Sequence, residues 1–302
     1  MSQIPGKTSP IKRICVFGDS LQDNGNLAKV LGFPLAPFDN GRFCNGPVAS
    51  EYLAEMIHDK QATEVAIINY AIGGALTSGK NPKSQLTRQA FPVGGQIDRF
   101  VSQEQRFNPD DVILLNGGGN NFIFALHDEA PYLNLPAVYR VADDLFQHAS
   151  RIAALGGRHM LLCNVPDVTV APAFNVSPFP AVVTKLVKKF LRKNIKKQNQ
   201  KLIEHILELR RKYPFVQIRM IDLHTFQNGI FEDPKAYGFD NAVDPCVESF
   251  GGVDSEGNIQ HDIEIKGDPE TYLFWDYVHP TSKVQKIIAE KMYQQLYALD
   301  SE

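Results

Sequence analysis

Short apolar runs rich in β-branched residues alternate along this chain with longer stretches in which apolar residues recur at helical spacing. The runs predict buried parallel strands and the longer stretches predict helices. The predicted strands are residues 14–17, 65–70, 112–116, 160–165 and 216–223. The predicted helices are residues 48–58, 96–105, 137–154 and 181–212, followed by a last helix after Pro280. This alternation predicts an α/β protein, a three-layer α/β/α sandwich around a central, mostly parallel five-stranded sheet.

Nothing in the pattern divides the chain. We find no internal repeat, low-complexity tract or linker, so residues 1–302 are expected to form a single domain. The stretch 228–271 has no convincing period and is expected to be a long loop, which in a compact domain is usually functional or mobile.

Composition and charge narrow the possible partners. The net charge of −3 argues against nucleic acid as the main partner. The charge is unevenly spread, because residues 168–203 contain eight Lys or Arg and no acid, whereas residues 232–270 contain eleven acids and two lysines. No run of apolar residues is long enough for a transmembrane segment. We expect no cofactor and no metal site.

The first twenty residues show no apolar run of the kind that a secretory signal requires. Localisation therefore stays open between the cytoplasm, export by a non-classical route, and a signal removed before this numbering. The four cysteines lack metal-ligand spacing, and we expect buried free thiols, leaving the disulfide state of Cys44 and Cys246 open.

Four polar motifs occur in a fixed order. They are FGDSLQDNGN at 17–26, NYAIGGA at 69–75, GGGNNF at 117–122 and FWDYVHPT at 274–281. The first three each follow a predicted strand. Because the carboxyl ends of parallel strands meet at one edge of a sheet, these motifs are expected to meet there.

The motifs contain the residues needed for acyl transfer. A serine hydroxyl needs a base to remove its proton, and we pair Ser20 with His279 for this reason. Asp276 lies three residues before the histidine and would orient the imidazole and stabilise its protonated form. Alone, the DYVH turn would be read as an acidic cap of the last helix. Trp275 either shields this turn from water or packs in the core.

An oxyanion hole needs hydrogen-bond donors aimed at the tetrahedral intermediate. The backbone amides of Ser20 and Gly74 and the side chain of Asn120 are our candidates. The alternative for Gly74 is a tight strand-to-helix turn, which also favours glycine. A phosphate cradle is a weak alternative for GGGNN, which lacks the Lys-Ser/Thr of a P-loop.

Together these segments resemble the SGNH or GDSL family of serine esterases and lipases, from Phe17 to Thr281. The resemblance implies a flavodoxin-like hydrolase fold, Ser20 as nucleophile, Asp276 and His279 as its partners, and Gly74 and Asn120 in the oxyanion hole. GRFCNGPVASEYLAE at 41–55, NVPDVTVAPAF at 164–174 and YLFWDYVHPT at 272–281 resemble the lipolytic branch. That branch includes bacterial phospholipases A, lysophospholipases and glycerophospholipid:cholesterol acyltransferases.

The chain departs from the family pattern in two places. Asn121 stands where relatives usually have aspartate, so in this chain an amide must take the role of that aspartate. Secreted relatives often carry paired cysteines in the loop before the Asp-His turn, where this chain has only Cys246, which is compatible with a reducing environment.

The basic segment offers a route to the substrate. Residues 171–193 interleave an apolar stripe with lysines, and a lid or substrate region is expected around 171–197. The stripe predicts a helix that docks on an anionic membrane and receives an acyl chain. The alternative is a helix packed on the sheet with its lysines in water. The candidate substrate-binding residues are Phe174, Phe179, Leu186 and Phe190.

Three functions follow from these observations. The first is a serine-dependent acyl ester hydrolase, a lysophospholipase or phospholipase A that can also transfer acyl groups. The second is a carbohydrate or small-ester deacetylase with the same machinery. The third, a catalytically silent lipid-binding protein, is disfavoured by the intact serine, histidine and aspartate.

Overall fold

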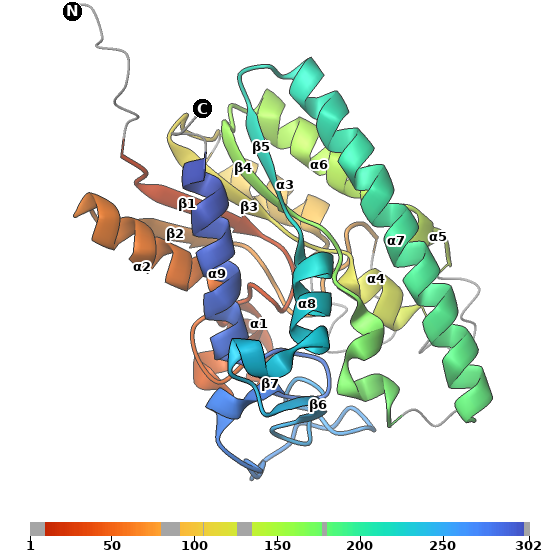
Figure 1. Cartoon of the computed structure of the whole chain (residues 1–302). Coiled ribbons are helices and arrows are strands. Elements are labelled where there is room, and N and C mark those ends of the chain that lie inside the picture. The colour runs from red at the N-terminus through yellow and green to blue at the C-terminus, as the bar shows by residue number, and fades with distance from the viewer. Residues whose placement is uncertain (1–9, 80–90, 105, 126–134, 177–179, 299–302) are drawn as a thin grey trace, which may run out of the picture.

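Five parallel strands form the central sheet of the computed structural model, which describes residues 10–79, 91–104, 106–125, 135–176 and 180–298 (Figure 1). Their order across the sheet is β2-β1-β3-β4-β5. The strands are β1 (Arg13–Phe17), β2 (Ala66–Asn69), β3 (Asp111–Leu115), β4 (His159–Cys163) and β5 (Gln217–Ile221). The predicted α/β class and parallel five-stranded sheet are confirmed.

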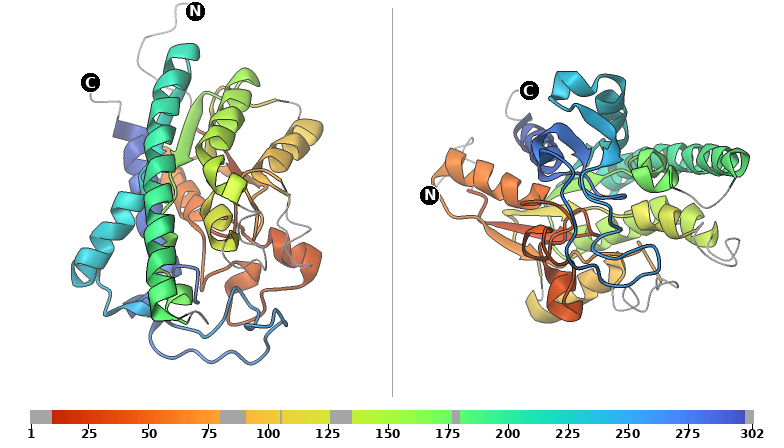
Figure 2. Two further views of the ribbon diagram at one scale, coloured as in Figure 1. Left: turned by 90° about the vertical axis from the view of Figure 1, so that its right-hand side faces the viewer. Right: turned by 90° about the horizontal axis from the view of Figure 1, so that it is seen from below.

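Both faces of the sheet are covered by helices, which explains why the strands are almost continuously apolar. In β1, Cys15 and Phe17 enter one core cluster and Ile14 and Val16 enter the other. The helices are α1 (Asn26–Leu31), α2 (Ala49–Gln61), α3 (Val93–Glu104), α4 (Gly119–Phe124), α5 (Leu135–Tyr139), α6 (Val141–Ala154), α7 (Ala181–Lys212), α8 (Leu223–Glu232) and α9 (Ser282–Tyr297). The cluster of Cys15 and Phe17 includes α3, α6 and α7, and the other includes α2, α8 and α9 (Figure 2).

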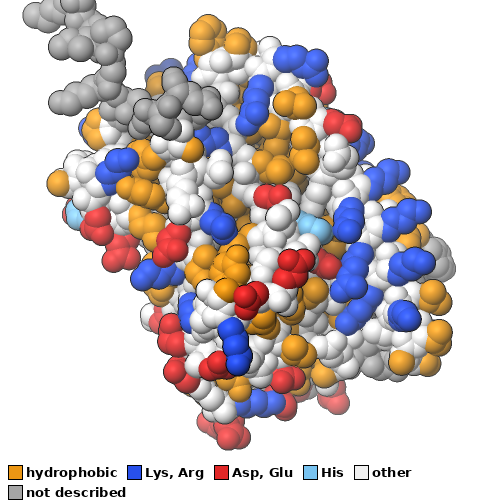
Figure 3. All heavy atoms as spheres, in the orientation of Figure 1, with side chains coloured by type: hydrophobic (Ala, Val, Ile, Leu, Met, Phe, Trp, Pro, Cys, Tyr) orange, Lys and Arg blue, Asp and Glu red, His pale blue; other side chains and the backbone are white. Residues whose placement is uncertain are grey.

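The long helix α7 begins and ends at the predicted residues. Its middle and C-terminal turns bury Leu191, Ile195, Leu202 and Leu209 against the core. Its N-terminal turns are different, because Val182 and Leu186 are exposed there. Lys and Arg side chains follow this helix on the face shown in Figure 3. The packed-helix alternative therefore holds for most of α7, although Ile203 and Leu207 are also exposed further along the helix.

The stretch 228–271 contains more regular structure than its sequence pattern indicated. Helix α8 runs through its first residues, and a 3-10 turn, η6 (Pro234–Tyr237), follows. Strands β6 (Asn241–Pro245) and β7 (Tyr272–Phe274) then pair in a small parallel sheet. Between them, the chain forms bends and isolated bridges beside the turn that carries Asp276.

All four cysteines are buried and free, as expected. Burial raises the pKa of the Cys44 thiol to about 12, so this residue is not a thiolate at neutral pH. Among the helices that the structure describes, none is both long and apolar enough to cross a bilayer.

Candidate active site

The turn after β1 that presents Ser20 is held from two sides. A side chain at Gly18 would displace the buried Asn116 side chain, because its Cβ would lie 1.6 Å from the Asn116 Oδ1 atom. Buried Gln96 of α3 accepts a hydrogen bond from the Gly18 amide at 2.8 Å and donates to the Gly18 carbonyl at 2.7 Å. The paired bonds fix the orientation of the peptide just before Asp19 and Ser20. Sequence reasoning did not identify Gln96, because no local pattern links it to the serine motif.

Asp23 joins the serine turn to the glycine turn after β2. Its carboxylate accepts hydrogen bonds from the amides of Gly25, Asn26 and Leu27, which pairs free amides at the start of α1. It also accepts from the Gly73 amide at 2.7 Å. The two turns that carry Ser20 and Gly74 are therefore fixed relative to each other.

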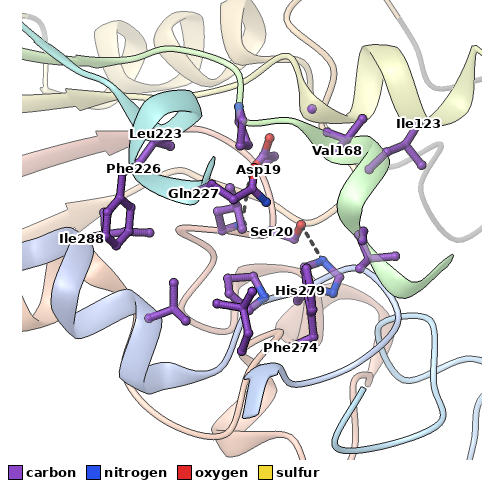
Figure 4. A pocket seen from close by; sticks show the side chains of 18 of the residues that line it. Asp19, Ser20, Ile123, Val168, Leu223, Phe226, Gln227, Phe274, His279 and Ile288 are labelled. Atoms are coloured by element: carbon purple, nitrogen blue, oxygen red, sulfur yellow. Dashed lines mark hydrogen bonds between the residues drawn. The ribbon is translucent and has the colours of Figure 1, made fainter. Parts of the chain in front are cut away.

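Three predicted site residues meet at the carboxyl edge of the sheet, and Figure 4 shows two of them, Ser20 and His279. The Ser20 Oγ atom lies 2.8 Å from the His279 Nε2 atom. The His279 Nδ1 atom lies 2.9 Å from Asp276 Oδ2 and 3.0 Å from Asp276 Oδ1. Asp276 is fully buried, whereas Ser20 and His279 each keep 8% of their surface exposed. The imidazole can thus take the serine proton while the carboxylate holds its other nitrogen.

Three backbone amides hold the Asp276 side chain in place. Its Oδ1 accepts from the amides of Val278 and His279, at 2.7 and 2.6 Å. Its Oδ2 accepts from the Gly251 amide at 2.7 Å. These donors fix the position of the carboxyl group against the imidazole. Gly251 was not predicted from the sequence; its φ of 73° lies in the left-handed region that favours glycine.

Two aromatic residues take different parts in this turn. Trp275 is buried and packs edge-on against Phe38, with ring centroids 6.0 Å apart. Phe43 lies closer to the chemistry, because its ring centroid is 5.0 Å from that of His279. Of the two roles considered for Trp275, the structure therefore shows core packing. The ring beside the imidazole is that of Phe43, which comes from the 41–55 segment.

The predicted oxyanion residues lie in the turns that flank Ser20. Asn120 is in the first turn of α4 and lines the same pocket as Ser20. One hydrogen of its amide is donated to the Ala75 carbonyl at 3.0 Å, which orients the side chain. Gly74 precedes that carbonyl and has a φ of 79°. A carboxamide nitrogen has two hydrogens, so Asn120 retains a second donor for a substrate oxygen.

Asn121, the departure from the family pattern, is a structural residue here. Its Oδ1 accepts from the Thr77 amide at 3.1 Å, and its Nδ2 donates to the Thr77 hydroxyl at 3.0 Å. Both groups of the amide are used, which an aspartate could not reproduce without a proton. Asn121 thereby holds the loop that contains the Ala75 carbonyl.

We expect Asn120→Ala to lower turnover by roughly 10²-fold with little change in KM, because an oxyanion donor acts mainly in the transition state. Steady-state kinetics on a soluble ester would measure this. Asn121→Ala is the matched control, and it should lower the melting temperature more than it lowers turnover. Unfolding by Asn120→Ala without a specific loss of turnover would indicate a structural role instead.

An apolar pocket opens beside Ser20 (Figure 4). Ser20, Asp19, Asn120 and His279 form its polar end. Helix α8, which the sequence did not predict, supplies one wall. The apolar walls are formed by Val168, Leu223, Phe226, Ile230, Leu273, Phe274, Val284 and Ile288. The pocket can therefore hold a hydrocarbon chain next to the serine hydroxyl.

The four candidate substrate-binding residues do not line this pocket where they are described. Phe174 packs against the core and lines a separate hollow beside α7. Leu186 is 63% exposed, and Phe190 packs against the core. Phe179 lies outside the described residues.

Buried Asp19 adds a further carboxyl group to the polar end. Its Oδ1 accepts from the Leu21 amide at 3.1 Å and from the Asn116 side chain at 3.0 Å. Burial raises the pKa of this carboxyl above its ordinary value, although the nearby His279 opposes the shift.

In the part of the chain that is described, no group of three His, Cys, Asp or Glu side chains is placed to hold a metal ion.

A serine, histidine and aspartate in hydrogen-bond contact at the carboxyl edge of a parallel sheet are the arrangement of a serine-dependent acyl-transfer enzyme. The model of the GDSL-like lipase/acylhydrolase family matches residues 14–292. The chain therefore belongs to this family of carboxylic ester hydrolases, and the resemblance found in its motifs is confirmed.

Curated relatives that match over most of the chain include a hemolysin and an acyltransferase. The thermolabile hemolysin of Vibrio parahaemolyticus is 28% identical over 93% of this chain and 63% of its own length. The phosphatidylcholine-sterol acyltransferase of Aeromonas hydrophila is 26% identical over 92% of this chain and 88% of its own. This chain thus spans less than two thirds of the hemolysin.

Among solved structures, an acetyl-xylooligosaccharide esterase from Geobacillus has a TM-score of 0.51. It is 13% identical, and the match covers 97% of each chain. At this identity the match supports the fold alone.

Proposed function

We propose that this protein is a lipolytic acyl ester hydrolase, with lysophospholipids or phospholipids as its substrates. Ser20 Oγ attacks the ester carbonyl while His279 takes its proton, and the resulting oxyanion accepts hydrogen bonds from Asn120 and from backbone amides of Ser20 and Gly74. His279 returns the proton to the leaving alcohol, and the acyl group stays on Ser20. Water then releases the fatty acid, or a second alcohol accepts the acyl group.

The observation that carries this proposal is the apolar pocket beside Ser20. An acetyl group would leave most of its aliphatic and aromatic wall uncovered. A longer acyl chain would gain about 0.8 kcal/mol for each methylene group that it buries there. The pocket therefore favours acyl chains of several carbons over acetate.

The names of the relatives support a lipid substrate. One is called a phosphatidylcholine-sterol acyltransferase, a name that specifies a phospholipid donor and a sterol acceptor for that protein. The motifs at 41–55, 164–174 and 272–281 were already typical of the lipolytic branch. We accordingly place this chain with the lipid-active members.

Deacetylation of a carbohydrate or another small ester is the main alternative. Fatty acid release from a lysophospholipid, compared with acetate release from an acetylated sugar, separates the two functions. A higher kcat/KM on the acetylated sugar would overturn the lipid proposal. Absence of both activities would revive the silent lipid-binding hypothesis.

Changing the pocket wall should change chain-length preference. Figure 4 places Phe226 and Ile288 at the end of the pocket away from Ser20. We expect Ile288→Phe to lower kcat/KM on an octanoyl ester about 10-fold and to leave an acetyl ester unaffected, because the larger ring occupies space needed only by the longer chain. Phe226→Leu, which removes volume, should favour longer chains.

Kinetics on a series of nitrophenyl esters would measure both variants, with thermal unfolding as the control for overpacking. An equal loss of activity on acetyl and octanoyl esters by a folded Ile288→Phe protein would show that the acyl chain does not enter this pocket.

A further inference from the structure

A basic hollow lies apart from the acyl pocket, between the first turns of α7 and the 3-10 turn η5 (Pro172–Phe174). Its lining includes Phe174, Asn175 and four cations, namely Lys185, Lys188, Lys189 and Arg192. The two cavities share no lining residue. The hollow is therefore not an extension of the pocket beside Ser20.

The positive charge of the hollow is only partly compensated. Arg192 pairs with Asp167 at 2.9 Å, and Lys188 donates a hydrogen bond to the neutral Asn175 side chain at 3.0 Å. Lys185 and Lys189 are exposed, and within the described residues neither forms an ion pair. Burial and the nearby Arg192 lower the pKa of Lys188. An anion in the hollow would relieve this repulsion.

Exposed apolar side chains accompany these cations. Val182 is 66% exposed, Leu186 63% and Val176 51%. Figure 3 shows hydrophobic and basic side chains together at the lower end of α7, the end at which these residues lie. Cations beside exposed aliphatic residues are typical of a surface that enters the boundary between lipid headgroups and acyl chains. A soluble anion would not contact these exposed aliphatic side chains favourably.

We propose that this hollow binds the phosphate group of an anionic phospholipid in a bilayer, on which the protein docks through the N-terminal turns of α7. Lys185 and Lys189 contact the phosphate, and Val182 and Leu186 insert beside it. The inference deepens the proposed function and rests on it, since a lipid hydrolase must hold its pocket against a lipid surface. The phosphate belongs to a neighbouring lipid, because the hollow and the acyl pocket are separate.

The test is vesicle binding by the Ser20→Ala protein, which keeps the lipid intact and makes the result independent of hydrolysis. With no further substitution, the Ser20→Ala protein should bind phosphatidylcholine vesicles that contain phosphatidylglycerol. It should bind pure phosphatidylcholine vesicles much more weakly. Lys185→Gln with Lys189→Gln should weaken binding to the anionic vesicles about 30-fold, since each cation near such a surface contributes about a factor of five.

The matched control is Lys196→Gln with Lys197→Gln, which removes the same charge from exposed positions of α7 outside the hollow. It should weaken binding less than about 3-fold. Activity of the Lys185/Lys189 variant, with Ser20 intact, should be unchanged on a soluble butyrate ester, which shows that it is folded.

If the Lys185/Lys189 and Lys196/Lys197 substitutions weakened vesicle binding equally, the hollow would not be the binding site. Equal binding to neutral and anionic vesicles would overturn the role of phosphate charge. Saturable binding of inorganic phosphate without vesicle binding would show that the hollow binds a soluble anion. That result would overturn the proposal that the protein docks on a bilayer. If the Ser20→Ala protein binds vesicles as expected but the wild-type protein hydrolyses no lipid, the proposed function fails and the docking site stands.

Discussion

Ser20→Ala is expected to leave a folded protein whose ester hydrolysis is reduced by about 10³-fold or more. The Ser20 Oγ atom lies 2.8 Å from the base and at the mouth of the apolar pocket, so no other hydroxyl is placed equally well among the pocket residues. Some rate above the uncatalysed reaction should remain, since the oxyanion donors and the pocket are unchanged. Initial rates on a nitrophenyl butyrate would measure the loss.

The melting temperature of Ser20→Ala is the control for folding, and it should be close to that of the wild type. Near-native turnover by the purified variant would remove Ser20 from the mechanism. If the melting temperature dropped strongly, the loss of activity could be due to unfolding rather than to the missing hydroxyl. Ser20→Cys would then be the second test of Ser20 as the nucleophile.

His279→Ala should be nearly as damaging, with a loss of about 10³-fold, because it removes the base that deprotonates Ser20. Asp276→Asn should cost about 10²-fold or more. Asp276 accepts hydrogen bonds from three backbone amides as well as from His279, and an asparagine NH₂ group would face one of these donors.

Rates measured from pH 5 to 8 provide the check on this base. Activity should fall on acidification, because a protonated imidazole cannot accept the serine proton. A profile that stays flat over this range would contradict a histidine base. Full activity of Asp276→Asn would show that another group orients the ring.

The strand pattern was predictable because each strand of this sheet is buried on both faces. Residues 14–17 and 112–115 must be apolar without interruption, and that local signal marks them in the sequence. Helix α8 was missed because it starts two residues after β5, so its first residue, Leu223, was included in the predicted strand. Sequence periodicity defines such short neighbouring elements poorly.

The residues of the reaction were easier to predict than the pocket around them. Ser20 and the Asp276–His279 turn sit in compact motifs, whereas the pocket wall is assembled from Val168, Phe226 and Ile288, which belong to three separate elements. Each of these looks like ordinary core in its own helix or turn. Gly251 and Gln96 also act through tertiary hydrogen bonds that no spacing in the sequence reveals.

The most direct test of the account is covalent labelling by two phosphonate esters that differ only in their alkyl chain, octyl against methyl. A phosphonate reacts with an activated serine, so mass spectrometry should find the label on the peptide containing Ser20 and on no other. The octyl compound should react at least 10-fold faster, because its chain gains burial in the apolar pocket. Labelling of a different residue, or equal rates for the two compounds, would contradict a Ser20 nucleophile served by an acyl-binding pocket.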